Sequence, residues 1–295
     1  MNDYIVRATA GNGSILAFAA TTKNLVNTAY ELHQTTPVAT AALGRLLTAM
    51  SMMGATLKND SDIITATIKG DGVIGGLVAT TDNQSNVKGF AYQPHIELLI
   101  NDRGKLDVGK AIGAGTLTIT KDLGLREPVS GQVDLISGEI AEDITYYFAA
   151  SEQLPSSVAL GVLVDTDNSV KQAGGFILQL MPGARDEIIA YLEEKLPQFP
   201  AVTALLEEGK SPEDILRMLF EGQGLTLHEK IYPTYSCNCS VEKTRKALLN
   251  VGAEELKTIL EEDKGANLHC HFCNRDYYFG EEIIREMLSA SLEVV

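Results

Sequence analysis

The pattern of apolar and polar residues at the start of the chain predicts a β-hairpin. Two strand-like runs, Tyr4 to Ala10 and Ser14 to Thr21, flank Gly11-Asn12-Gly13. A tight turn needs positive φ angles, which glycine and asparagine tolerate. We therefore predict a hairpin over residues 1–21. Helical spacing then predicts two helices, the first from Leu25, Ala29 and Leu32 and the second from Pro37 through Leu43, Leu46, Leu47 and Met50.

Strand-like runs dominate the following part of the chain, as far as residue 180. They cover residues 63–68, 77–81, 87–92, 116–120, 157–164 and 174–180. One helix interrupts them, and its predicted start is Ser137-Gly138-Glu139, where the serine would cap and the early acids would complement the positive helix end. The strand pattern ends at Met181-Pro182-Gly183, and the composition changes after it. We place a domain boundary there, after an N-terminal domain of residues 1–183.

The segment after this boundary is acidic and repeatedly broken by proline and glycine. Residues 184–230 carry ten acidic and five basic residues. They predict short helices, one of them beginning at Ser211-Pro212-Glu213-Asp214, which has a capping hydroxyl and a proline at the first helical position. Short helices are unstable in isolation. We therefore expect a helical linker over residues 184–233, whose order depends on docking to a neighbouring domain.

Length and charge narrow the classes of protein that the chain can belong to. At 295 residues the chain suggests about two domains. Its 39 acidic and 24 basic residues give a formal charge of −15, which argues against general nucleic-acid binding. Met1-Asn2-Asp3-Tyr4 lacks a basic region followed by an apolar run, and no stretch approaches the ~18 apolar residues of a membrane span. We expect a cytoplasmic protein without membrane partners.

The candidate chemistry lies in four cysteines, all within the last 60 residues. Cys237-x-Cys239 is followed after thirty residues by Cys270-x-x-Cys273. Two closely spaced thiolate pairs can supply the tetrahedral shell of one zinc ion. The local core is small, and its leucines are Leu248, Leu249, Leu256 and Leu260. A module of this size needs additional stabilisation, such as a bound metal. We predict a C-terminal zinc-binding module over residues 234–295, folded by the metal.

The spacing leaves open whether this zinc site is static or redox-active. Zinc binding selects the thiolate, which is also the form that peroxide and disulfides attack. A permanent structural site is the simpler interpretation. Against it, a Cys-x-Cys pair is unusual in a static zinc finger, and Cys-x-x-Cys is an exchange-active spacing. His269 and His271 flank Cys270, but four sulfurs already complete the shell, so we expect both histidines to be exposed.

The longer segments of the chain resemble the redox-regulated 33 kDa chaperonin family, the zinc-dependent heat-shock holdases of bacteria. The resemblance spans nearly the whole chain. Its residues include the motifs Cys237-Asn-Cys239-Ser240-Val-Glu242 and Cys270-His-Phe-Cys273, Tyr278-Phe279, Ser137 to Tyr147 with Ser151 to Ser156, and Gly104 to Val108 with Lys121 to Gly124.

The resemblance implies a chaperone that is regulated by oxidation. The reduced form would hold one Zn²⁺ on Cys237, Cys239, Cys270 and Cys273 and be inactive. Oxidation would join Cys237 to Cys239 and Cys270 to Cys273, release the zinc and unfold the module and the linker. The exposed apolar surface would then hold unfolding client proteins without ATP, in a molecule that tends to dimerise, with a possible transfer of clients to an ATP-dependent foldase. Candidate client contacts are Ile188, Ile189, Leu192, Leu205, Ile215, Leu219 and Phe220, for which ordinary helix packing is an equal alternative.

Other signals in the sequence favour other classes less well. Gly70-Asp-Gly72-Val-Ile-Gly75 matches a dinucleotide-binding pattern, but strand-like residues follow it where a helix is needed, so we predict a hairpin turn. Acid–base carboxylates at positions 139, 142, 143 and 152 have no nearby nucleophile. A thiol-disulfide oxidoreductase would need a thioredoxin-like setting around Cys270, and a zinc-dependent nucleic-acid binder would need more basic residues. The sequence predicts an α+β binding protein, not an enzyme.

Overall fold

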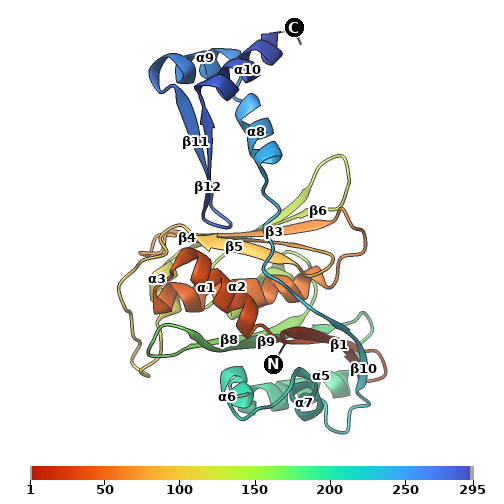
Figure 1. The fold of residues 1–295 in the computed structure, drawn as a ribbon. Coiled ribbons are helices and arrows are strands. Elements are labelled where there is room, and N and C mark those ends of the chain that lie inside the picture. Colours follow the sequence, from red (N-terminus) through yellow and green to blue (C-terminus); the bar gives the residue numbers. More distant parts are fainter. Residues whose placement is uncertain (1, 293–295) are drawn as a thin grey trace. The chain divides into compact units, whose positions relative to one another are not determined.

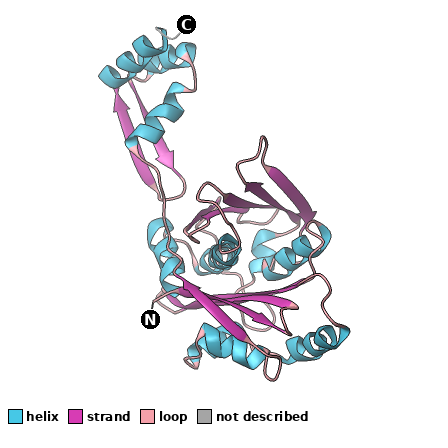
Figure 2. Cartoon of the chain, turned by 90° about the vertical axis from the view of Figure 1, so that its right-hand side faces the viewer, coloured by secondary structure: helices cyan, strands magenta, loops and turns pink. Residues whose placement is uncertain are grey.

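The structure is a computed structural model that describes residues 2–292, with side chains up to Ser289. Its internal contacts divide the chain into two compact units, Met1–Ser236 and Cys237–Val295. Helices and antiparallel sheets occur in both units (Figures 1 and 2). The predicted α+β class is confirmed. Within residues 2–292, no helix is long and apolar enough to cross a membrane.

The first sheet of the larger unit is built around the predicted N-terminal hairpin. Its strands lie in the order β10-β1-β2-β9-β8, all antiparallel. Their bounds are Tyr4–Ala10 (β1), Ile15–Thr21 (β2), Ser156–Val164 (β8), Val170–Leu180 (β9) and Thr226–Ile231 (β10). The hairpin is confirmed: Gly11, Asn12 and Gly13 have φ angles of 59°, 55° and 84°. The two later strands that the sequence predicts here are confirmed as β8 and β9.

The second sheet has the order β5-β4-β3-β6-β7. Its bounds are Ile63–Gly70 (β3), Gly76–Asp82 (β4), Val87–Ala91 (β5), Gly115–Asp122 (β6) and Val129–Asp134 (β7). The Gly70–Gly75 pattern joins β3 to β4, and the Gly75 amide donates to the Gly72 carbonyl at 3.0 Å. The predicted hairpin turn is confirmed. A Cβ on Gly72 would lie 2.4 Å from the Ala111 carbonyl oxygen, so close packing explains the glycine there.

A helical layer separates the two sheets of this unit (Figures 1 and 2). It contains α1 (Lys23–His33) and α2 (Pro37–Gly54). The same unit also contains α3 (Val108–Ile112) and α4 (Ala141–Ala150). Nearly every residue of α2 is buried, because sheets cover it on both sides. Apolar residues of both sheets join it in one core that includes Phe18, Leu46, Ile64 and Ile177. The two helices predicted after the hairpin are confirmed.

Short helices cover the outer face of the first sheet (Figure 1). They are α5 (Asp186–Lys195), the 3-10 turn η1 (Leu196–Gln198), α6 (Val202–Glu207) and α7 (Pro212–Leu219). The Ser211 hydroxyl caps α7 by accepting from the Asp214 amide, as predicted. Six of the seven candidate client contacts are buried here against the sheet, and Ile189 is partly buried; they are Ile188, Leu192, Leu205, Ile215, Leu219 and Phe220. In this conformation they are packed helix faces.

Two local predictions are wrong. Ser137 does not cap a helix, because α4 begins at Ala141; the Asp143 carboxylate instead accepts from four amides of the preceding loop, at residues 136, 137, 138 and 140. Residues 226–231 are not helical but form β10. Their pairing with β1, more than 200 residues earlier, overrides the local pattern.

A short strap follows β10 and ends the larger unit. Val87 forms an isolated parallel bridge with Tyr235, its amide donates to the Thr234 carbonyl at 2.8 Å, and its carbonyl accepts from the Ser236 amide at 3.0 Å. The Tyr235 hydroxyl donates to the Gly89 carbonyl at 2.7 Å and lies 3.0 Å from His33 Nε2. Residues 226–231 thus pair with β1 at the edge of the first sheet, and Tyr235 then bridges to β5 at the edge of the second sheet.

The smaller unit contains three helices and a hairpin among its described residues. Their bounds are Val241–Leu249 (α8), Ala253–Glu262 (α9), Gly265–Cys270 (β11), Arg275–Gly280 (β12) and Glu281–Leu292 (α10). The helices predicted after Ser240 and Gly252 are confirmed, whereas the hairpin and α10 were not predicted. The buried side chains of its described part are Leu248, Leu256, Tyr277, Phe279, Ile284 and Met287. The core is small, as the sequence predicts.

Candidate metal centre

The first two cysteines lie in extended chain directly before α8. Ser240 ends this segment, and its hydroxyl accepts from the Lys243 amide to cap the helix. The helix cap fixes where the chain turns from Cys239 into α8. Cys237 and Cys239 are both partly buried and both are free thiols.

The other two cysteines lie at the turn of the β11–β12 hairpin. Cys270 ends β11 and pairs with Arg275 on β12. The Cys270 carbonyl accepts from the amides of Cys273, at 3.3 Å, and Asn274, at 2.8 Å. Asn274 has a φ of 58°, a conformation that asparagine tolerates better than most residues. This tight turn places the Cys273 sulfur within 4.8 Å of the Cys270 sulfur.

The four sulfurs form one compact cluster, and all lie within 4.8 Å of one another. The Cys237 and Cys270 sulfurs are 3.7 Å apart, and those of Cys239 and Cys273 are 3.3 Å apart. A tetrahedral zinc site with zinc–sulfur bonds of ~2.3 Å has sulfur–sulfur edges of about 3.8 Å. The cluster therefore has the size and the ligand type that a zinc ion requires.

Tyr277 is a neighbour of the cluster that sequence reasoning missed. Its hydroxyl lies 3.0 Å from the Cys239 sulfur. Burial raises the pKa of Cys239, but hydrogen bonds from Tyr277 and the other cysteines outweigh it and lower that pKa to about 7. Burial and bonding to the other sulfurs raise the pKa values of Cys237 and Cys273. Cys239 thus becomes a thiolate more readily than Cys237 or Cys273.

The two histidines beside Cys270 are exposed, as expected. His269 Nδ1 lies 2.9 Å from Asp276 Oδ1, and the His269 and His271 rings pack edge to face with centroids 5.3 Å apart. Neither belongs to the group of possible metal ligands.

Three of the four carboxylates considered for acid–base chemistry have structural partners. Glu139 pairs with Arg45 and accepts from the Gly109 amide. Asp143 holds the loop before α4. Glu152 pairs with Lys121 and accepts from the Tyr147 hydroxyl at 2.8 Å.

Comparison with known proteins agrees with the fold and the cysteine cluster. The family model described as Hsp33 protein matches residues 3–280. The chain belongs to the Hsp33 family. Among Hsp33 relatives, the 33 kDa chaperonin of Lachnoclostridium phytofermentans is 49% identical over 99% of this chain and 100% of its own length. That of Acetivibrio thermocellus is 52% identical over 96% of this chain and 95% of its own length.

A solved Hsp33 structure has the same fold. The crystal structure of the 33 kDa chaperonin (heat shock protein 33 homolog) from Thermotoga maritima superimposes with a TM-score of 0.92 at 34% identity. It covers 99% of this chain and 100% of its own. The family resemblance noted in the sequence is confirmed, and with it the chaperone class. Membership of a chaperone family implies that the chain binds unfolded client proteins.

Proposed function

We propose that this Hsp33 protein is a redox-regulated, ATP-independent holdase whose switch is the cluster of Cys237, Cys239, Cys270 and Cys273. The observation that supports this most is the position of four free thiols within 4.8 Å in a unit with a small buried core. When bound, a zinc ion supplies the charge that holds four thiolates together, and apparent zinc-binding free energies of ~10–16 kcal/mol are enough to fold such a unit. The reduced, zinc-bound form is the inactive one.

Oxidation of the thiols is the proposed activating step. Cys237 joins Cys239 and Cys270 joins Cys273, and each new sulfur–sulfur bond takes two electrons from two thiolates. One molecule of hydrogen peroxide accepts these two electrons, together with two protons from the solvent, and becomes two molecules of water. A disulfide sulfur is a far poorer metal ligand than a thiolate, so the zinc is released.

The sulfur positions alone do not select this pairing, because the two shortest separations recorded cross between the motifs. Chain entropy does distinguish the alternatives. A bond from Cys237 to Cys270 would close a loop of over thirty residues and stabilise the unit by about 3–4 kcal/mol. A bond within each motif closes a ring of a few residues and restrains the unit very little. Only pairing within the motifs suits a switch that works by unfolding.

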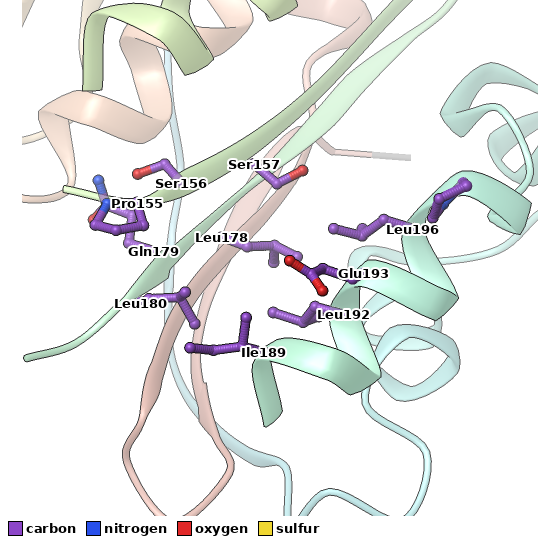
Figure 3. A pocket seen from close by; sticks show the side chains of 11 residues that line it. Pro155, Ser156, Ser157, Leu178, Gln179, Leu180, Ile189, Leu192, Glu193 and Leu196 are labelled. Carbon is purple, nitrogen blue, oxygen red and sulfur yellow. The ribbon is translucent and has the colours of Figure 1, made fainter. Parts of the chain in front are cut away.

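We propose that residues 184–233 act as the linker that unfolds after the zinc-binding module, while residues 1–183 persist. The α5 helix of this segment is incompletely packed on the sheet, because an apolar cavity of about 480 Å³ lies beneath it. Figure 3 shows Ile189 and Leu192 of α5 facing Leu178 and Leu180 of β9 across this space. Departure of the helices would uncover both apolar faces, which then bind unfolding clients.

The remaining features follow from this mechanism and from the family. Exposed apolar surface favours self-association, so we propose a homodimer for the active form. Holding needs no nucleotide, and bound clients then pass to an ATP-dependent foldase. Four free thiols need a reducing compartment, so we propose the cytoplasm. The protein acts by binding and not as an enzyme.

The first test measures zinc content and suppression of thermal aggregation of a model client, before and after peroxide at mildly elevated temperature. We expect zinc release together with a gain in suppression, both reversed by a thiol reductant. Suppression that is independent of oxidation, or zinc retained throughout, would show a static metal site instead.

The second test identifies the disulfides by mass spectrometry of non-reduced peptides. Cleavage between residues 240 and 269 separates the two motifs, so pairing within the motifs leaves two unlinked peptides. A crosslinked peptide carrying both motifs would contradict the proposed pairing even if zinc is released.

A further inference from the structure

A second cavity lies inside the larger unit, between the two sheets, and the chaperone function does not account for it. Its volume is about 200 Å³. Buried side chains from both sheets and both neighbouring helices form its floor: Phe18, Met52, Ile64, Phe148 and Ile177. The half-buried Lys121 and Glu152 and the exposed Thr56 lie at its mouth. The cavity is thus apolar at depth and charged at its opening.

Gln179 lines this cavity and is unusual for a buried polar residue. It is only 7% exposed and its side-chain amide forms no hydrogen bond to another described residue, but that amide is not among the fully buried polar atoms that lack a partner. The amide is therefore open to the space of the cavity. Side chains alternate along β9, so Gln179 shares the face of Ile177, which lies in the core between the sheets. An amide that faces an accessible space offers both donors and an acceptor to a molecule bound there.

The charged pair at the mouth also has unused bonding capacity. Lys121 Nζ and the Tyr147 hydroxyl both contact the same oxygen of Glu152, Oε1. Glu152 Oε2 has no partner within the described part of the chain, and Lys121 contacts no second acceptor there. The ammonium of Lys121 carries three N–H donors. One cation and one anion therefore stand side by side, each able to bind one more group of opposite charge.

We propose that this cavity binds a free apolar α-amino acid of the size of leucine or methionine. The zwitterionic head of such a molecule carries one carboxylate and one ammonium on the same carbon. The carboxylate fits Lys121, the ammonium fits Glu152 Oε2, and the Gln179 amide can bond to either. The opposite charges of the head group and of the Lys121–Glu152 pair offset part of the cost of removing them from water.

Size and polarity of the floor define the rest of the ligand. At about 30 Å³ for each water molecule, 200 Å³ corresponds to about seven waters, which is the scale of a single amino acid rather than a peptide. The floor is formed by aromatic, aliphatic and methionine side chains, which favour an unbranched or leucine-like apolar group. Because the lining comes from β2, β3, β6, β9, α2 and α4, the ligand would stabilise the contact between the two sheets.

The test is isothermal titration of the reduced full-length chain with L-leucine and L-methionine. We expect binding of one molecule per chain and a rise in the melting temperature with ligand concentration. Two probes omit one charge each: L-leucinamide lacks the carboxylate and 4-methylpentanoate lacks the ammonium. Each should bind about tenfold more weakly or worse, since a hydrogen bond to a charged group is lost. These probes need no altered protein.

Variants locate the site. Lys121→Met, Glu152→Gln and Gln179→Leu should each weaken L-leucine binding by about tenfold or more. Gln172→Leu makes the same change on the same strand outside the cavity and should leave binding unchanged. Absence of any L-leucine binding would overturn the proposal, as would binding that the three variants do not affect. Equal binding of L-leucinamide or 4-methylpentanoate would overturn the recognition of a zwitterion.

Discussion

The Tyr277 hydroxyl and the Cys239 sulfur show how one side chain can adjust the proposed zinc site. The two atoms are 3.0 Å apart, and Tyr277 is 8% exposed. Its hydrogen bond to Cys239 raises the pKa of Tyr277. The phenol therefore stays protonated, and its O–H group donates a hydrogen bond to the sulfur. A donor of this kind stabilises negative charge on a thiolate ligand and holds the ligand in place.

Replacing Tyr277 by phenylalanine should therefore weaken zinc binding. The ring would still fill the small core, but the donor to Cys239 would be gone. We expect about tenfold weaker binding in competition with a chromogenic chelator, and earlier zinc release at a given peroxide concentration. Tyr278→Phe is the matched control, because that side chain is 71% exposed. Unchanged affinity in Tyr277→Phe would show that the phenol has no part in holding the metal.

At the scale of single residues, the sequence predicts the four cysteine ligands but not the residues that contact them. Two short cysteine pairs in a segment without other cysteines indicate a metal site by spacing alone. Tyr277 contacts Cys239 only because the β11–β12 register places it on the inner face of the hairpin, and no local pattern predicts that register. Asp143 was missed as the residue that holds the loop before α4, because Ser137 has the more usual capping side chain.

At the scale of elements, one ionic network ties α7 to the first sheet. The Tyr4 hydroxyl donates to Glu213 Oε2 at 2.8 Å, and Lys230 Nζ lies 2.6 Å from Glu213 Oε1. The Lys230 ammonium also lies 4.3 Å from the centre of the Tyr4 ring. Burial raises the pKa of Glu213, but the bonds from Lys230 and Tyr4 outweigh it and hold that pKa below its ordinary value.

This network predicts that acid loosens α7. A carboxyl group whose pKa is lowered by folding adds stability that is fully present above its ordinary pKa, and that stability is lost as the pH falls through the lower folded-state value. We expect Glu213→Gln to lower stability by about 1 kcal/mol at neutral pH and to flatten part of the acid dependence of the melting temperature. Glu208→Gln changes an exposed acid in the same segment and should do neither. An acid dependence identical in both variants would exclude Glu213 as its source.

The strap at residues 232–236 gives a second prediction at this scale. Tyr235 uses its hydroxyl to bond the Gly89 carbonyl and His33, in the segment that leads directly to Cys237. Tyr235→Phe removes that hydroxyl and should cost about 1–3 kcal/mol, because partners in a partly buried site lose their bonds. We expect oxidation to activate this variant at a lower temperature, measured by client aggregation. Tyr232→Phe, at 60% exposure, should behave as the unaltered chain. An unchanged activation temperature for Tyr235→Phe would separate the strap from the switch.

Local pattern predicts elements well where the element depends on its own residues. The hairpin at Gly11-Asn12-Gly13 and the α7 cap at Ser211 are of this kind. Strand β10 is not, since Thr226–Ile231 contains three charged or titratable residues and becomes a strand by pairing with β1. Strand β7 is also mostly exposed and has no apolar alternation strong enough to predict it.

On the scale of the whole molecule, the two units differ greatly in the core that each buries. The larger unit has two apolar clusters, one between its sheets and one beneath α5–α7. The smaller unit has the single cluster around Leu256 and Tyr277 among its described residues. Small domains bury too little apolar surface to fold on that basis alone. Loss of stability should therefore begin in the smaller unit and spread to the helices that cover the first sheet.

Removal of zinc by a chelator under reducing conditions tests this order of unfolding directly. Hydrogen exchange monitored by mass spectrometry should show loss of protection first in residues 237–292, because their small core depends on the metal. Residues 184–233 should follow at higher temperature, while the core between the two sheets stays protected. A chelator acts without forming disulfides, so loss of protection would assign the stability to zinc and not to the thiols. Protection of residues 237–292 that survives complete zinc removal would mean that this unit folds by itself, and a switch based on its unfolding would then need a different cause.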